Sequence, residues 1–350
     1  MRMKRLLVIG AFGFREEHYD GQTIKSRNLL HLLEQKGLNP DYFETQNFKY
    51  NKLSVLTMFW KVLRCKTLFY LPAYNNLRYI FPFIYFLAKL ANVRIHYFVV
   101  GGWLKEFIED KPRLKRKLSK INGIHCETQL MKDLLIKEYG FNNVDVFPNF
   151  RISNFKPAMH HEDGKLKLVF MARVIKMKGI DTIFSLCEKI KQAGLDGKIT
   201  IDFYGPQQDH EKNKDGSIEY FNFHIKQYDF VAYHGPINPA GINVTLEKYD
   251  AMLLPTHFYT EGLPGSVLDA YMSGIPVIVT RWKHAAEFVD DGQTGIIIFF
   301  EDDGTELFEA VKKLYNDTQL LIDMKTASTK KAYEFSADKA WELIQKYLEQ

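Results

Sequence analysis

Short apolar runs alternate with helical patterns along the chain, and the alternation starts again near its middle. In the first half, LLVIGAF is followed by a helical pattern over residues 23–35 and then by the β-rich runs TLFYLPA, RIHYFVV, GIHCET and VDVFPN. In the second half, helical patterns over residues 181–193 and 266–273 are interspersed with LKLVFMARV, KITIDFYG, FVAYHG, YDAMLLP, IPVIVT and GIIIFF. Such alternation is typical of βαβ units on a parallel sheet. The sequence therefore predicts two Rossmann-like, doubly wound α/β domains in tandem.

The break between the domains is predicted at residues 150–165, where Asn, Pro, His and Gly interrupt any regular period. A chain of 350 residues exceeds the range in which a single core usually keeps growing, which favours two domains. We assign residues 1–155 to the first domain and residues 156–335 to the second. Apolar positions at helical spacing predict that residues 336–350 form a helix that packs across a domain surface.

Composition and charge exclude several classes of protein. With 46% apolar and 25% charged residues, the chain is not wholly disordered. Its three cysteines are far apart, so they indicate neither a disulfide framework nor a Cys-rich zinc site, and we expect a reducing, cytoplasmic setting. The net charge of +5 is modest, so we expect no nucleic-acid partner. The longest apolar stretch, residues 80–88, is far shorter than the roughly 20 residues of a membrane-spanning helix.

The segment YTEGLPGSVLDAYMSGIPVIVT places a Gly- and Pro-rich turn between a buried strand and a helix. Gly262 and Gly265 permit close approach of a ligand to the backbone. The amides that open the helix near Ser266 and Val267 carry the positive end of the helix dipole. We therefore expect this turn to bind an anionic diphosphate.

Charged side chains accompany this turn. Glu261 and Asp269 flank the start of the helix; the alternative for such a pair is a capping acid followed by a solvated helical Asp. In FMARVIKMKGID, Arg173 and Lys178 follow a strand and lie on the carboxyl edge of the sheet, where open α/β folds bind ligands. Two fixed cations there would neutralise a diphosphate leaving group, whereas the alternative is that both are merely solvated.

These motifs resemble those of the retaining glycosyltransferases of family GT4, many of which build bacterial surface polysaccharides. The resemblance implies the GT-B fold, in which two Rossmann-like domains face a central cleft. The family's E-x7-E motif corresponds to Glu261 and Asp269, with Asp in the second position, and ARVIKMKG contains its Arg and Lys. FYGP, YHGPI and IPVIVTRWKHAAEFVDDGQTG resemble other segments of the family's donor domain, so the resemblance spans nearly the whole chain.

The resemblance also implies roles for single residues. Glu261 would hold the hydroxyls of the donor sugar, Asp269 the ribose hydroxyls, and Arg173 and Lys178 the diphosphate. Because Asp reaches one methylene less than Glu, the ribose assignment is weakened. Ile237 would lie beside the nucleobase, with a core position as the alternative. The donor-binding residues implied in this way are Gly21, Gly205, Ile237, Gly262, Leu263, Pro264, Gly265, Ser266, Val267 and Asp269.

The first half of the chain contains the acceptor-side candidates. HYDGQTIKSRNLLHLL resembles the family's glycine loop and first helix, so Gly21 would approach the diphosphate or the acceptor; a turn with a helix cap is the alternative. RIHYFVVGGWLKEF departs from the family pattern, because Val rather than His precedes Gly101 and Gly102. His96 lies upstream, and a lone His in a strand is more often structural. We nevertheless retain His96, Gly101 and Gly102 as acceptor-side candidates.

A mixed apolar and basic surface is indicated by LSVLTMFWKVLRCKTLFY and by RLKRKLSK at residues 113–120. In some proteins such segments bind to the surface of anionic membranes. In this protein the surface would be the inner face of the cell membrane. The alternative is a core-packing helix with a solvated basic face. The two interpretations predict different exposure of the apolar side chains.

The function implied by the resemblance is retaining transfer of a hexose or N-acetylhexosamine from a nucleotide diphosphate sugar, UDP-linked by family prevalence. The acceptor would be a glycan or a lipid-linked glycan in bacterial capsule, exopolysaccharide or O-antigen synthesis. The sequence contains no D-x-D pair and no H-x-x-x-H spacing, so neither a metal nor a cofactor is expected, and Glu261, Arg173 and Lys178 would carry the chemistry. The alternatives are a nucleotide-sugar epimerase of the same fold and a non-catalytic nucleotide-sugar-binding partner.

Overall fold

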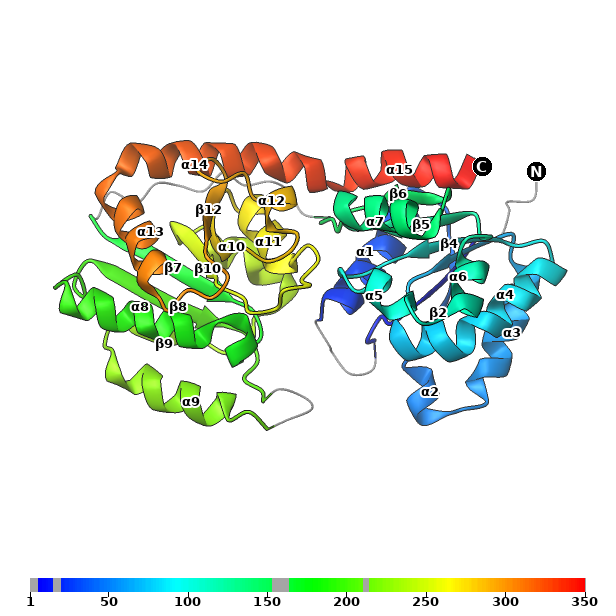
Figure 1. Ribbon diagram of the computed structural model, residues 1–350, viewed down its shortest axis with the longest axis horizontal. Helices are drawn as coiled ribbons and strands as arrows, with labels where there is room; N and C mark the ends of the chain where they lie inside the picture. Colours follow the sequence, from blue (N-terminus) through cyan, green and yellow to red (C-terminus); the bar gives the residue numbers. More distant parts are fainter. Residues whose placement is uncertain (1–5, 15–19, 153–163, 210–213, 350) are drawn as a thin grey trace. The chain divides into compact units, whose positions relative to one another are not determined.

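The computed structural model describes residues 6–14, 20–152, 164–209 and 214–349, and the chain divides into two compact units. Unit 1 comprises Met1–Ile152 and Phe335–Gln350, and unit 2 comprises Ser153–Glu334. Each unit contains a six-stranded parallel sheet with helices around it (Figure 1). The prediction of two doubly wound α/β domains is confirmed. The division expected at residue 155 lies outside the described residues, and the C-terminal segment belongs to unit 1.

The sheet of unit 1 has the strand order β2-β1-β3-β4-β5-β6. Its central strands are buried throughout, as expected for parallel strands covered on both faces. The strands are β1 (Leu6–Gly10), β2 (Asp41–Glu44), β3 (Thr67–Tyr70), β4 (Arg94–Phe98), β5 (Gly123–Cys126) and β6 (Val144–Val146).

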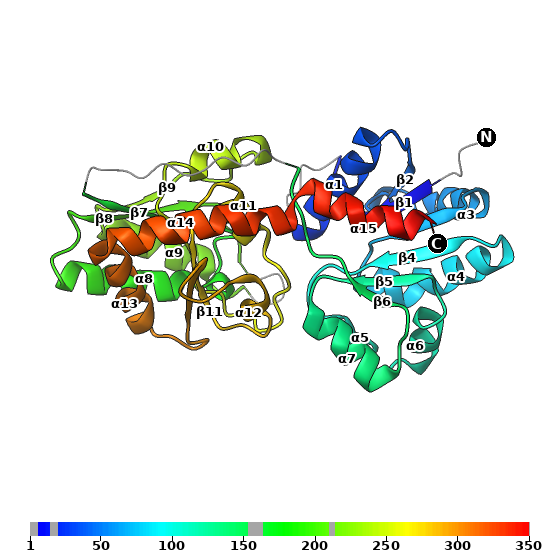
Figure 2. The same cartoon turned by 90° about the horizontal axis from the view of Figure 1, so that it is seen from above.

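Two separate hydrophobic cores cover the faces of this sheet. On one face lie α1 (Gly21–Gln35) and α15 (Ala337–Glu349), the C-terminal helix (Figure 2). The other face is covered by α3 (Ser54–Arg64), η1 (Asn76–Ile80), α4 (Phe81–Leu90), α5 (Leu104–Ile108), α6 (Pro112–Leu118) and α7 (Gln129–Tyr139), while the short α2 (Asn47–Tyr50) precedes α3. Residues from both ends of the chain are thus needed to close the core of unit 1.

The sheet of unit 2 has the order β12-β11-β10-β7-β8-β9. Its strands are β7 (Leu166–Met171), β8 (Ile199–Tyr204), β9 (Val231–Tyr233), β10 (Ala251–Leu254), β11 (Val277–Thr280) and β12 (Gly295–Ile298). Its helices are α8 (Ile180–Gln192), α9 (Ser217–His224), α10 (Ile242–Leu246), α11 (Gly265–Met272), α12 (Ala285–Phe288), α13 (Thr305–Asn316) and α14 (Thr318–Ala332). In this unit α8 packs with α13, and α11 packs with α10 and α14.

The strand order determines where unit 2 can bind a ligand. From β7 the chain adds β8 and β9 on one side, and then returns to add β10, β11 and β12 on the other side of β7. The reversal leaves a crevice at the carboxyl ends of β7 and β10, where ligands bind in open α/β sheets. The loops that follow these two strands contain the charged residues singled out in the sequence.

Candidate active site

The loop after β7 is held against the end of β10 by a glycine. The short helix η2 (Lys176–Lys178) is followed by Gly179, whose φ is 83°. A Cβ atom at this position would lie 1.9 Å from the carbonyl oxygen of Pro255, in the segment after β10. Only glycine combines that backbone conformation with such a close approach. Gly179 therefore brings the two loops into contact.

Lys178 and Glu261 meet at this contact, although they are 83 positions apart in the chain. Lys178 Nζ donates to Glu261 Oε2 at 2.5 Å, and the Thr256 hydroxyl donates to the same oxygen at 3.4 Å. The two charged side chains are 10% and 19% exposed, so the pair is shielded and yet reachable from solvent. The structure thus brings together two of the three residues that the sequence assigned to the chemistry.

Arg173 joins this pair through an aromatic ring. The Arg173 guanidinium lies 6.0 Å from the centroid of the Phe258 ring, and Lys178 Nζ lies 5.1 Å from it. Within the part of the chain that the structure describes, the Arg173 guanidinium makes no ion pair. Its planar fork of N–H donors is suited to a phosphate oxygen. The site therefore presents two cations and one carboxylate around a single ring.

His257 ties the two loops together. Its backbone N–H donates to the Met177 carbonyl at 3.0 Å, and its Nε2 lies 3.1 Å from Asp181 Oδ1 in the first turn of α8. The hydrogen bond to Asp181 raises the pKa of His257 above its usual value. Sequence reasoning did not identify Gly179, His257 or Phe258. Their sequence signals are a glycine directly after Lys178 and the aromatic run between β10 and Glu261.

The turn and helix after Glu261 occupy the expected position. Helix α11 begins at Gly265, one residue before the predicted start, and the amides of a first helical turn lack partners within the helix. Asp269 lies inside α11 and is only 7% exposed, so the alternative of a solvated helical Asp is wrong. The remaining residues of the motif lie in the turn and first helical turn: Gly262, Leu263, Pro264, Gly265, Ser266 and Val267.

Two further donor-side candidates follow β8 and β9. Gly205 has a φ of 129°, and a Cβ atom there would lie 1.8 Å from the carbonyl oxygen of Ala172, which precedes Arg173. Gly205 therefore fixes the backbone that carries Arg173. Its own N–H donates to the Gly235 carbonyl at 2.9 Å. Ile237 lies two residues further along this loop and is half-buried, so it is not a full core residue.

The acceptor-side candidates belong to unit 1. Gly21 is the first residue of α1, and Asp20 caps this helix by accepting from the Thr23 N–H at 2.8 Å. Gly101 and Gly102 follow β4, and the Gly101 N–H donates to Glu127 Oε2 at 2.9 Å.

His96 has a structural environment within unit 1. It is fully buried, and its Nδ1 lies 3.1 Å from His125 Nε2, beneath the ring of Tyr347 from α15. Burial, and secondarily Arg94, lowers the pKa of His96 to about 4. These contacts favour the structural interpretation of this histidine.

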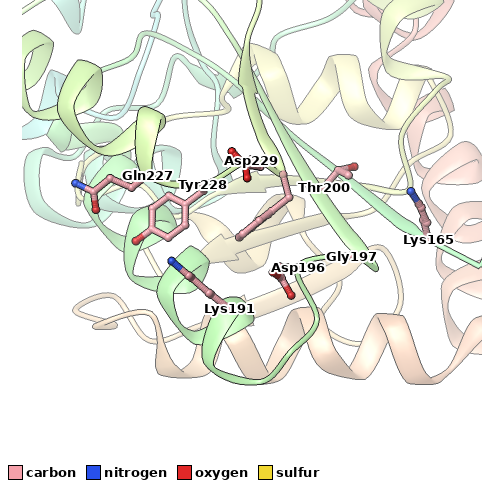
Figure 3. Close-up of a pocket in the computed structure, with 9 residues that line it drawn as sticks. Lys165, Lys191, Asp196, Gly197, Thr200, Gln227, Tyr228 and Asp229 are labelled. Carbon is pink, nitrogen blue, oxygen red and sulfur yellow. The ribbon is translucent and has the colours of Figure 1, made fainter.

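A separate pocket in unit 2 lies at the opposite edge of the sheet (Figure 3). Lys165 precedes β7, Asp196 and Gly197 precede β8, and Tyr228 precedes β9, so these lining residues lie at the amino ends of the strands. Open α/β sheets bind their ligands at the carboxyl ends. The cluster around Glu261 is therefore the better candidate site.

The sequence of unit 2 matches a known family. Residues 165–317 match the glycosyl transferases group 1 family. Among curated proteins, the D-inositol 3-phosphate glycosyltransferase of Arthrobacter sp. strain FB24 is 23% identical over 215 residues, which cover 57% of this chain and 49% of that protein. The putative colanic acid biosynthesis glycosyltransferase WcaL of Salmonella typhimurium is 26% identical over 137 residues, 38% of this chain and 32% of that protein. The matches thus span about half, or less, of these relatives.

Solved structures resemble the whole chain. Anabaena HepE in complex with UDP-glucose superposes with a TM-score of 0.74 at 13% identity and covers 99% of both chains. Sucrose-phosphate synthase from Thermosynechococcus elongatus gives a TM-score of 0.76 at 12% identity, covering 99% of this chain and 98% of that one. At this level of identity the likeness concerns the fold. The chain therefore has the GT-B fold and, as its motifs predicted, resembles the group 1 glycosyl transferases.

Proposed function

We propose that this protein is a retaining, GT4-type glycosyltransferase that uses a nucleotide diphosphate sugar. The observation that carries the proposal is the cluster of Arg173, Lys178 and Glu261 at the switch point of unit 2, beside the start of α11. Two cations and a helix N-terminus suit a diphosphate, while an accessible carboxylate suits sugar hydroxyls. The match of residues 165–317 to the glycosyl transferases group 1 family supports the same activity.

In the proposed reaction, Arg173 and Lys178 bind the diphosphate and stabilise the charge that grows on it as the sugar departs. Glu261 orients the sugar hydroxyls. When the diphosphate enters, Lys178 exchanges part of its contact with Glu261 for phosphate oxygens. Asp269 and Ile237 are assigned to the ribose and the base, and the departing phosphate oxygen takes the proton of the acceptor hydroxyl. Because fixed cations neutralise the leaving group, the reaction needs no bound metal or other cofactor.

We propose a UDP-linked hexose or N-acetylhexosamine as donor, a glycan or lipid-linked glycan as acceptor, and a role in capsule, exopolysaccharide or O-antigen synthesis. The solved HepE structure contains UDP-glucose, and WcaL is named for colanic acid biosynthesis, which supports this choice. Such an enzyme would work in the cytoplasm, at the inner face of the membrane.

The test is thermal stabilisation of the purified protein by UDP and UDP-sugars in the presence of a chelator. At a ligand concentration 100 times the dissociation constant, linkage predicts about 2.7 kcal/mol of added stability. Glu261→Gln should still bind UDP, should keep its melting temperature, and should lose transfer. Stabilisation that disappears in chelator would contradict the metal-free site. Binding without turnover would indicate a non-catalytic partner, and release of an isomerised sugar would indicate an epimerase.

A further inference from the structure

Two neighbouring helices of unit 1, α3 and α4, expose an apolar stripe each. The exposed side chains recur at spacings of three and four, so each set lies along one side of its helix. Their exposed fractions range from 43% to 72%. On and before α3 they are Leu53, Leu56, Trp60 and Leu63, and on η1 and α4 they are Tyr79, Phe83, Phe86 and Leu90. We call these eight residues the α3–α4 face.

The two helices are held to the sheet mainly by residues outside this face. Their inner sides, including Met58, Val62 and Ile84, are fully buried in one core against the sheet. Phe59 and Phe83 connect the two helices, with ring centroids 6.3 Å apart. Both views show α3 and α4 beside each other at the edge of unit 1 (Figures 1 and 2). A contiguous apolar surface of this kind marks an interaction site rather than a folding requirement.

The charge of this region is one-sided. No Asp or Glu occurs from residue 45 to residue 105, although 42 acidic residues in 350 would place about seven in a segment of this length. The same segment has nine Lys and Arg residues. Some of these are engaged, such as Lys61, which pairs with Asp41 at 2.5 Å. The exposed ones are Lys49, Lys52, Arg64, Lys66, Arg78 and Lys89.

Aromatic rings and cations are combined at this surface. The Arg64 guanidinium lies 4.4 Å from the Trp60 ring centroid, and the Arg78 guanidinium lies 5.1 Å from that of Tyr79. Trp and Tyr beside Arg are typical of the boundary between lipid headgroups and acyl chains, where one end of each ring is apolar and the other wet. Helix α6 packs next to α4 and adds the exposed Arg113 and Arg116.

We propose that the α3–α4 face docks onto an anionic lipid bilayer, with its apolar side chains in the headgroup boundary and its basic residues on acidic phospholipid. The basic charge of the face favours an anionic bilayer over a second copy of the chain, because a symmetric contact between two copies would bring basic residues against basic residues. None of the helices in the described ranges combines the length and the apolar character of a membrane span. The purpose of the contact rests on the proposed function, because a lipid-linked acceptor is held in the bilayer.

Co-sedimentation with vesicles tests the docking directly. The full chain should bind vesicles of phosphatidylethanolamine with phosphatidylglycerol, should bind neutral phosphatidylcholine vesicles much less, and should lose binding as salt screens the charges. Phe83→Ser with Phe86→Ser should lower the partition coefficient by about tenfold or more, because both rings leave the boundary. Phe223→Ser with Phe299→Ser removes two equally exposed rings from unit 2 and should change nothing.

A second measurement separates insertion from adsorption by charge alone. Brominated acyl chains should quench the tryptophan fluorescence of the bound protein, and Trp60→Phe should remove that quenching while binding persists. Arg78→Glu with Lys89→Glu should lower binding to anionic vesicles by about tenfold and leave binding to neutral vesicles unchanged. All altered side chains are exposed, so the melting temperature should stay constant.

The outcomes distinguish this proposal from the proposed function. Absence of vesicle binding by the wild type, or equal binding by the Phe83 and Phe86 variant, would overturn it. A dimer in sedimentation velocity that this variant dissociates, without vesicle binding, would make the face a contact between copies and also overturn it. UDP stabilisation and transfer to a water-soluble acceptor should persist in the variant, and their loss in the wild type would instead count against the proposed function.

Discussion

Units 1 and 2 each contain a six-stranded parallel sheet, but they differ in the exposure of a lysine–glutamate pair near the carboxyl edge. In unit 1, Lys25 Nζ donates to Glu127 Oε1 at 2.8 Å and to the carbonyls of Val99 and Phe147 at 3.0 and 3.5 Å. Its side chain is 1% exposed and that of Glu127 is 2% exposed. In unit 2, the Lys178–Glu261 pair is 10% and 19% exposed. The first pair is closed within the protein, whereas the second is reachable from solvent.

Backbone amides show the same contrast. Directly after β1, the N–H groups of Phe12 and Gly13 donate to Glu44 Oε2 at 2.9 and 2.8 Å. An internal carboxylate thus occupies donors that a phosphate would otherwise use. Both units thus have a carboxyl edge with charged residues, and the exposure of those charges distinguishes the two edges.

The largest difference in stability between the two lysine–glutamate pairs is expected when Lys25 is replaced. Replacing Lys25 by Met leaves Glu127 buried without its cation, and removing one partner of a buried pair costs about 3–5 kcal/mol of stability. Lys178→Met should cost less than about 1 kcal/mol, because Glu261 remains partly solvated. Chemical denaturation, followed by hydrogen exchange of the strand amides in each unit, measures both. Equal costs for the two variants would show that exposure does not separate the pairs.

The chemistry proposed for unit 2 depends on Arg173 and Lys178. Each single Ala variant should lose about a hundredfold in turnover at saturating donor, since one charge-stabilising donor contributes on the order of 3 kcal/mol to the barrier. The double variant should lose less than the product, because both cations act on one leaving group. Wild-type turnover in either single variant would remove that residue from the transition state. Lys176→Ala is the matched control, because Lys176 Nζ donates to the Asp215 carbonyl instead.

Acid should weaken unit 1 through its buried histidines. Burial lowers the pKa of His96 from 6.5 to about 4 and lowers that of His125 well below its usual value. A depressed histidine pKa means that the unfolded chain takes up protons first, so stability is present above about pH 6.5 and is lost as the pH falls towards 4. The loss should be about 2–3 kcal/mol. His96→Gln should flatten this slope in hydrogen exchange of unit 1, while the exposed His31→Gln should leave it unchanged.

The smallest predicted effect is in unit 2, where local stability should fall as the pH rises. Because the hydrogen bond to Asp181 raises the pKa of His257, its contribution is fully present below about pH 6.5 and is lost as the pH rises through the raised value. For this partly exposed pair the contribution should be less than about 1 kcal/mol. The loops around Met177 and His257 should therefore open more often as the pH rises. Their amide exchange should accelerate by more than the intrinsic exchange rate does. An identical pH dependence in Asp181→Asn would contradict this role.

Local sequence patterns were enough to predict the architecture and the edge of the sheet at which the candidate site lies. Apolar runs alternating with helical patterns specify βαβ units, because side-chain periodicity is a local property of the chain. The helices predicted at residues 181–193 and 266–273 are observed one residue earlier, as Ile180–Gln192 and Gly265–Met272. Side-chain periodicity locates a helix but does not fix its terminal residues. Motif resemblance then indicated Glu261, Arg173 and Lys178 as the residues to examine.

Which charged residues meet, and which helix faces stay exposed, depends on tertiary contacts. Lys176 and Lys178 are two residues apart, yet one contacts the segment before α9 and the other contacts Glu261. The apolar and basic stretch around α3 was compatible with both a core helix and a membrane surface, and the helix proves to have a buried side and an exposed one. These outcomes depend on contacts between residues far apart in the chain. Local sequence patterns cannot specify such contacts, because exposure is set by what the rest of the fold covers.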